Sequence, residues 1–202
     1  MIMRLRSLAI ISAALFLASC NSGEKARLSN PKTPYLAGGG NPETPGTSGY
    51  DPISYWDGDG VSGRPSVTIF LNEQRAYFYK DDQLVGVSQV SAGREGHDTP
   101  PGTYKIIQKD PNHASSLYGD YADAMGNVVQ KDVEHGKDPI PPGAHFVGAP
   151  MPYFMRITGG VGMHQGYLPG YPASHGCIRM PGKMAQIFYN NVDVGTPVTV
   201  MR

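Results

Sequence analysis

The stretch HQGYLPGYPASHGCIR, from His164 to Arg179, decides how this chain is interpreted. It brings two histidines and one cysteine, Cys177, together across a loop rich in glycine and proline. A cysteine attacks as the thiolate, and a nearby imidazole can take its proton. The stretch therefore contains the minimum set for nucleophilic acyl transfer, with Cys177 as the nucleophile and the upstream His164 as the base.

Three other interpretations of these residues are weaker. Cys177 as a buried structural cysteine explains neither histidine. A zinc site needs three or four ligands at suitable spacing. His164, His175 and Cys177 are only three, and the upstream loop has no paired motif, so we predict no metal. A papain-like protease does not fit, because its cysteine precedes its histidine along the chain.

The run Ser174-His175-Gly176-Cys177-Ile178-Arg179, with His164 before it, resembles the signature of L,D-transpeptidases of the YkuD type. These bacterial enzymes cross-link peptidoglycan. The resemblance covers roughly the last two thirds of the chain, although many members have a longer loop before this run. It implies a mainly β fold: a sandwich or barrel of mostly antiparallel strands with one or two short helices.

The resemblance also implies a reaction. Cys177 would form a thioester with a peptidoglycan stem peptide and transfer it to an amine, giving a 3→3 cross-link without any cofactor. Gly176 and the Cys177 N–H would support the oxyanion, while His175 would orient groups in the site or be a structural histidine. The residues expected to bind substrate are Ser174, Arg179 and Tyr167.

Two further functions stay open at this stage. Water in place of the amine would make the protein an L,D-carboxypeptidase or a hydrolase of peptidoglycan–protein links, with the same nucleophile and base. A non-catalytic, peptidoglycan-binding lipoprotein would only hold stem peptides in the cleft. The formal net charge is zero, so nothing suggests a nucleic-acid partner.

The N-terminus has the pattern of a targeting segment. Arg4 and Arg6 precede an apolar run, residues 8–17, that is too short to span a bilayer permanently. The next residues resemble a lipobox, which predicts cleavage before Cys20 and lipidation of that cysteine. A disulfide between Cys20 and Cys177 is the alternative. Asn21 in place of aspartate favours the periplasmic face of the outer membrane over the inner membrane.

We therefore expect three parts: a lipoprotein signal peptide (1–19), a Gly/Pro-rich tether (20–64) and the catalytic domain (65–202). Trp56 lies in the tether region, where it either docks on the domain or binds a ligand. Alternation of apolar residues predicts strands, and apolar residues at helical spacing after Pro181 predict a short helix. The predicted strands cover residues 66–71, 75–79, 84–91, 103–108, 146–149, 153–157 and 196–200.

Residues 110–142 show no clear periodicity and are read as a long polar loop. Loops of this length in a compact domain are usually functional or mobile. A flap over the site and a plain surface insertion are both compatible with the sequence.

Overall fold

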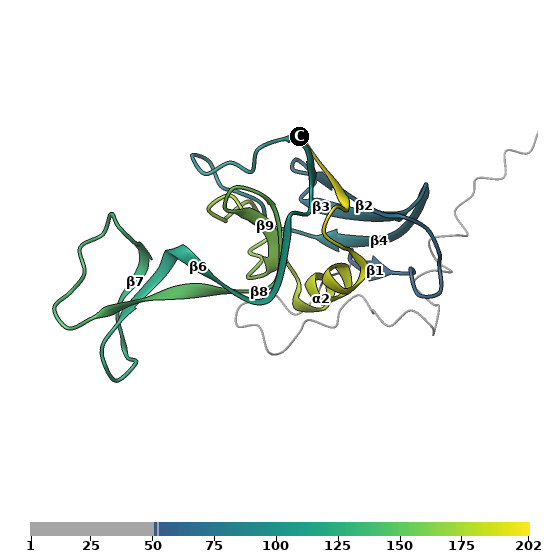
Figure 1. Cartoon of the computed structure of the whole chain (residues 1–202). Helices are drawn as coiled ribbons and strands as arrows, with labels where there is room; N and C mark the ends of the chain where they lie inside the picture. Colours follow the sequence, from purple (N-terminus) through teal and green to yellow (C-terminus); the bar gives the residue numbers. More distant parts are fainter. Residues whose placement is uncertain (1–50, 52) are drawn as a thin grey trace, which may run out of the picture.

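The computed structural model of the chain describes residues 51 and 53–202. The strands of this part form two sheets (Figure 1). The first sheet contains, in spatial order, β1 (Tyr55–Trp56), β4 (Gln83–Gln89), β3 (Arg75–Lys80), β2 (Pro65–Phe70), β11 (Pro197–Met201) and β5 (Gly102–Lys105). The second contains β10 (Ile178–Met180), β9 (Val161–Gln165), β8 (His145–Thr158), β6 (Gln108–Ala122) and β7 (Val128–Glu134).

Neighbouring strands are antiparallel except in two pairs, β11 with β2 and β10 with β9. One helix, α2 (Gly182–Asn191), follows Pro181 as predicted and buries Met184, Ala185 and Phe188. For the part of the chain that the structure describes, a mainly β fold with mostly antiparallel strands and one short helix is thereby confirmed. Within the described residues, no helix has the length and apolar character needed to cross a membrane.

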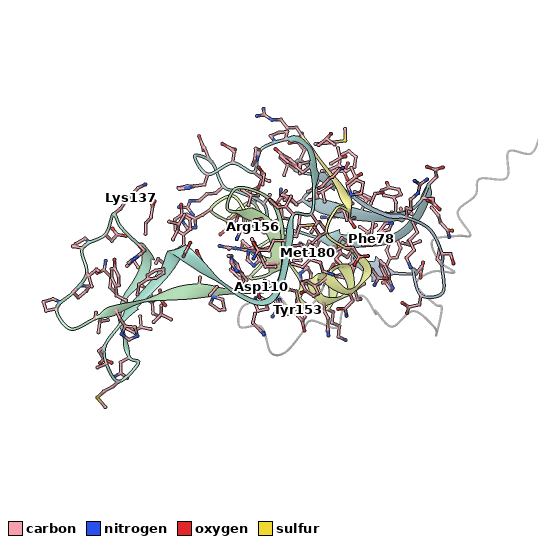
Figure 2. All side chains as sticks on the ribbon, in the orientation of Figure 1. Phe78, Asp110, Lys137, Tyr153, Arg156 and Met180 are labelled. Atoms are coloured by element: carbon pink, nitrogen blue, oxygen red, sulfur yellow. The ribbon has the colours of Figure 1, made fainter. Side chains whose placement is uncertain are left out.

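One hydrophobic core joins both sheets and the helix. Val67, Ile69 and Phe78 contribute from the first sheet, Met155 and Met163 from the second, and Phe188 from α2. The ring of Phe78 lies edge-on to that of Phe188, with centroids 5.0 Å apart. Figure 2 shows Phe78 and Met180 in this central part of the molecule. The core fixes the relative position of β9 and β10, the two strands next to the candidate site.

Trp56 is a core residue, which settles the question that the sequence left open. Its side chain is buried and lies edge-on to Phe78 at 5.1 Å. Its indole N–H donates to Asp59 Oδ1 at 2.8 Å, which satisfies the one polar atom of the ring. A Cβ added at Gly86 would sit 2.6 Å from the indole, so this close packing requires glycine there. Packed structure thus extends upstream of the expected boundary at residue 65, while residues 1–19, Cys20 and most of the tether lie outside the described part.

A hairpin extension projects from the core toward the left of Figure 1. We use this name for residues 114–150, which comprise the distal parts of β6 and β8 together with β7. The expectation of an irregular loop at residues 110–142 was therefore wrong, and the two strands expected at 146–149 and 153–157 are one long strand, β8. Many side chains here are exposed on both faces, so the sequence lacks the alternation of a half-buried strand. Backbone pairing along β8 supplies the regularity instead.

The regular strand pairing of the extension is interrupted close to the core. The pairing of β6 with β8 shifts register between Ala114 and Gly119, so residues 115–118 leave the regular ladder. Gly119 and Gly148 let the backbones approach closely: a Cβ at either position would lie about 2 Å from a carbonyl oxygen of the opposite strand. Residues 115–118 border the cavity described next.

Candidate active site

A pocket of about 450 Å³ lies between the hairpin extension and the loop that carries Cys177. Strands β6, β8 and β9 and the loop before β10 all contribute to its wall. Its lining includes His113, Ser115, Ser116, Leu117, Tyr118, Met151, Arg156, Gly160, His164, Tyr167, Ser174, His175, Cys177 and Arg179. The predicted catalytic pair and all three predicted substrate-binding residues thus face one cavity, as does His175.

Cys177 stands directly before β10, whose parallel pairing with β9 brings its neighbour Ile178 opposite Met163. The thiol is partly buried and donates to the Gly160 carbonyl at 3.4 Å. Burial raises the pKa of the thiol above its ordinary value, opposed by a hydrogen bond from the Gly162 backbone and by the charges of Arg179 and Arg156. At neutral pH the sulfur is therefore held as a thiol.

His164 projects from β9 and is only 5% exposed. Its Nδ1 lies 2.7 Å from the Gln165 carbonyl oxygen, which can only accept a hydrogen bond, so Nδ1 carries the proton. The Gln165 carbonyl thus orients the ring of His164. Nε2 is then left with its lone pair, the form that a general base requires.

Burial lowers the pKa of His164 to about 4, and the charges of Arg179 and His113 act in the same direction. His164 is therefore neutral over the physiological range, and so is Cys177. This arrangement differs from a resting thiolate–imidazolium pair, since proton transfer must accompany attack on the substrate rather than precede it.

Ser174 and Gly176 shape the turn that presents Cys177. The Ser174 hydroxyl is buried, accepts from the Gly176 N–H at 3.0 Å and donates to the Cys177 carbonyl. Gly176 has φ of 110°, a conformation that strongly favours glycine. Its carbonyl accepts from the hydroxyl of Thr99 at 2.8 Å. The contacts of Ser174 are thus those of a turn-stabilising residue, although it also borders the pocket.

His175 lies on the other side of this turn and contacts the extension. Its ring stacks on that of Tyr118, with centroids 4.1 Å apart and planes 19° apart, and lies edge-on to His97 at 4.8 Å. Burial lowers the pKa of His175, and the nearby charges of Arg94, His97 and Arg179 lower it further. His175 thereby joins the Cys177 turn to the wall of the extension.

Two arginines border the cavity. The backbone of Arg179 pairs with Ser91 in both directions, at 2.9 and 3.0 Å, and its half-buried side chain packs over Gly166. Arg156 donates through Nε to Gln108 Oε1 at 2.7 Å and through Nη1 to the Gly159 carbonyl at 2.6 Å. A guanidinium fixed in this way presents a preorganised positive charge to an anionic ligand.

Sequence reasoning missed several residues of the site. Thr99 belongs to a Thr-Pro-Pro-Gly run that precedes the predicted strand 103–108, and its hydroxyl donates to the Gly176 carbonyl. Arg156 sits in an ordinary strand pattern that carries no local signal of a site. His113 and Tyr118 are visible in the sequence only as polar or aromatic members of an unassigned segment. Within residues 51 and 53–202, no three His, Cys, Asp or Glu side chains converge as a metal ion would require.

Known proteins resemble this chain in sequence and in fold. A Mycobacterium tuberculosis protein described as "Probable L,D-transpeptidase 3" is 29% identical over 151 residues, which cover 70% of this chain and 47% of that protein. The chain thus spans about half the length of the relative it matches.

Solved structures support the fold. An L,D-transpeptidase from Enterococcus faecium aligns with a TM-score of 0.51 and 23% identity over 69% of this chain and 50% of its own. One from Mycobacterium smegmatis aligns with a TM-score of 0.50 and 20% identity over 69% of this chain and 59% of its own. The sequence profile of the YkuD L,D-transpeptidase catalytic domain matches residues 64–200. This chain therefore belongs to the family defined by the L,D-transpeptidase (YkuD) catalytic domain.

Proposed function

We propose that this protein is an L,D-transpeptidase that links peptidoglycan stem peptides through a thioester on Cys177. The observation that carries the proposal is that Cys177 and His164 border one pocket, with the His164 proton fixed on Nδ1. Family membership supports the reaction class. The substrate chemistry follows from that class: a stem peptide with a meso-diamino acid at the third position and D-alanine after it.

In the first half-reaction, Cys177 Sγ attacks the carbonyl carbon of the amide that precedes D-alanine. His164 Nε2 takes the thiol proton as the S–C bond forms and gives it to the departing amine as the C–N bond breaks. D-Alanine leaves and the thioester remains. In the second half-reaction, the side-chain amine of another stem attacks the thioester, and the sulfur leaves with the electron pair of the S–C bond.

The oxyanion of each tetrahedral intermediate needs a hydrogen-bond donor close to the sulfur. The Gly176 N–H is already donated to Ser174 Oγ, so the Cys177 N–H is the donor we assign. Arg179 and Arg156 supply positive charge for the substrate carboxylates, and Tyr167, which is 46% exposed, supplies an apolar wall. We assign His175 a positioning role through its stack on Tyr118.

The alternatives differ in what reaches the thioester. Water would give an L,D-carboxypeptidase or a hydrolase of peptidoglycan–protein links. A binding protein would leave the sulfur unreacted, and the tautomer of His164 argues against that function, because Nε2 is kept ready to accept a proton. We further propose that the protein acts in the cell envelope, anchored by lipid on Cys20. This rests on the signal-peptide and lipobox patterns alone.

The test incubates the purified protein with a disaccharide tetrapeptide and follows the products by mass spectrometry. We expect a 3→3 dimer and free D-alanine, with turnover at least about 10³-fold lower in Cys177→Ala. Tripeptide without dimer would instead identify a carboxypeptidase. A folded wild-type protein that forms no thioester and no product would contradict the proposal and favour a binding function.

A further inference from the structure

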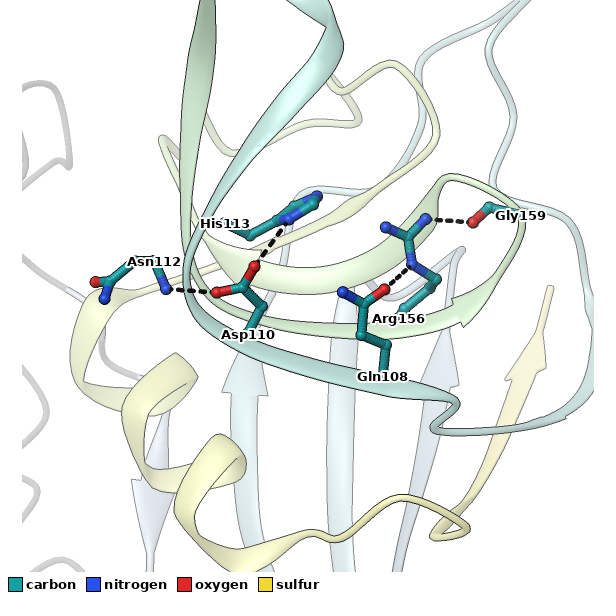
Figure 3. A network of polar contacts seen from close by, with 6 residues as sticks. All are labelled: Gln108, Asp110, Asn112, His113, Arg156 and Gly159. Carbon is teal, nitrogen blue, oxygen red and sulfur yellow. Dashed lines mark hydrogen bonds and ion pairs between the residues drawn. The ribbon is translucent and has the colours of Figure 1, made fainter.

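A third histidine, besides His164 and His175, borders the pocket. His113 lies on β6 and borders the cavity, and its Nδ1 is 3.2 Å from Asp110 Oδ2. The side chain of His113 is 19% exposed and that of Asp110 36% exposed. Figure 3 shows the carboxylate between two partners, since its other oxygen accepts from the Asn112 N–H at 3.0 Å. Asp110 is therefore held in place and fixes the histidine in turn.

This pairing sets the tautomer of His113. A carboxylate accepts the proton on Nδ1, so the neutral ring keeps its lone pair on Nε2. Among the described residues, nothing hydrogen-bonds to Nε2. The ring also stacks on Phe154, with centroids 4.2 Å apart and planes 14° apart, which fixes its plane. Two contacts thus position the ring, one with a carboxylate and one with an aromatic face, while Nε2 stays available to a ligand.

The two histidines share Phe154 as a neighbour, because the ring of His164 lies 6.2 Å from that of Phe154. The charged groups around His113 are Asp110 on its own strand, Arg156 on β8, whose guanidinium carbon is 5.0 Å from the Phe154 ring, and His164 on β9. A positive charge on His113 disfavours one on His164. The two rings therefore accept protons more easily one after the other than both at the same time.

The proposed reaction needs a second proton acceptor. An alkyl ammonium with a pKa of about 10.4 is almost wholly protonated at neutral pH and cannot attack. It must lose two protons to become an amide nitrogen, one before attack and one as the thioester breaks. His164, which borders the same pocket as Cys177, can relay the second of these. The first must go to a base on the side from which the acceptor enters.

We propose that His113, positioned by Asp110, is the general base for the acceptor amine. This inference rests on the proposed function. The ammonium gives one proton to His113 Nε2, and the resulting amine attacks the thioester carbonyl carbon, forming the N–C bond. The S–C bond then breaks, and the second proton passes from the nitrogen through His164 to the departing sulfur. The products are the amide, the Cys177 thiol and protonated His113, which releases its proton to solvent.

The test separates the two half-reactions. His113→Phe keeps an aromatic ring for the Phe154 stack and removes the base, and Asp110→Asn keeps the shape of the positioning residue without its charge. The matched control is His135→Phe, because His135 stacks on Phe146 at 4.5 Å and does not border the pocket. D-Alanine release in the first turnover and thioester mass report acylation, while dimer formation reports acceptor transfer. Thermal melting checks the fold of each variant.

We expect His113→Phe to acylate within about twofold of wild type, to accumulate thioester and to form dimer about 10²-fold more slowly. Asp110→Asn should slow dimer formation by about tenfold, and His135→Phe should match wild type. Hydroxylamine is unprotonated at neutral pH and needs no base, so it should release the accumulated thioester of His113→Phe at the wild-type rate. A purely structural defect would not be rescued in this way.

Two results would overturn the inference while leaving the proposed function intact. One is dimer formation by His113→Phe at the wild-type rate. The other is an equal loss of acylation and transfer, which would make His113 a residue that shapes the donor site. Failure of the proposed function gives a different result, since wild-type protein would then form no thioester on Cys177.

Discussion

The core and the hairpin extension are built on different physical principles. In the core, large apolar side chains from both sheets and α2 are fully buried around Phe78 and Phe188. In the extension only a few side chains, such as Tyr121 and Val133, are buried, while Met125 is 88% exposed and Val128 47%. Hydrogen bonding between β6, β7 and β8 gives the extension its shape. Figure 2 shows Lys137 on the extension, to the left of the core.

Because of this difference, we expect the core to determine stability and the extension to contact substrate. The core holds β9 and the Cys177 turn in register, so rigid elements keep Cys177 and His164 in fixed positions. The extension supplies the opposite wall of the pocket, including the 115–118 bulge with Tyr118, and His113 borders the pocket next to it. A region with little burial can change shape at low cost in free energy. Loss of core packing should therefore act on folding, and changes in the extension should act on substrate.

The largest effect should follow from Phe78→Ala. The ring is fully buried between Trp56 and Phe188, so its removal leaves a cavity at the centre of the core. We expect the free energy of unfolding to fall by about 3 to 5 kcal/mol, measured by urea denaturation. The matched change in the extension, Met125→Ala, should shift it by less than about 0.5 kcal/mol. Similar losses in both variants would abolish the distinction between the two regions.

The second prediction concerns the buried residue His164 and the dependence of stability on pH. Burial holds its pKa at about 4 in the folded protein, against an ordinary value of about 6.5. The unfolded chain binds this proton first as the pH falls, so stability is full above about pH 6.5 and declines toward pH 4. At pH 5 the loss from this group should be about 2 kcal/mol. His164→Gln should remove that part of the pH dependence in denaturation curves recorded at pH 7 and pH 5.

The low pKa of His164 also predicts how the rate of acylation depends on pH. Acylation of Cys177 requires neutral His164, so its rate should hold between pH 7 and pH 5 and fall only near pH 4. A midpoint near 6.5 would mean that the ring is solvated in the working enzyme. Single-turnover release of D-alanine over this range distinguishes the two outcomes.

A smaller effect is expected from Tyr118→Ala in the extension. The change removes the stack on His175 and part of the pocket wall. We expect kcat/KM to drop by about tenfold, while unfolding free energy changes by less than about 1 kcal/mol. Tyr118→Phe keeps the stack and should retain most activity. Cooperative unfolding of Tyr118→Ala at a much lower denaturant concentration would instead show that the extension supports the core.

The smallest effect should come from Lys137→Ala. Its ammonium lies 2.8 Å from Glu134 Oε1, and its side chain is 75% exposed. Exposed ion pairs of this kind contribute little to folding. We expect thermal melting and dimer formation to stay at wild-type levels, whereas a clear loss of activity would place the Lys137–Glu134 pair in contact with substrate.

The predictability of each region follows from its burial. Half-buried strands alternate in hydrophobicity, and the helix after Pro181 repeats its apolar residues at helical spacing, so β2, β3, β4, β11 and α2 were recognisable. The extension has no such period, since β6 and β7 are largely exposed on both faces. Its strands exist because β8 offers a pairing edge, a partner that no local window of sequence contains.

The sequence alone determined the family signature, the Cys177 and His164 candidates and most of the mainly β core, because each is encoded by residue types at short spacing. Tertiary structure decided the rest. It placed Trp56 in the core, connected Thr99 to the Gly176 carbonyl across 77 residues, and brought His113 and His164 to one pocket through the order β6, β8, β9. These contacts join segments far apart in the chain, and their geometry depends on sheet pairing and burial that only the folded molecule provides.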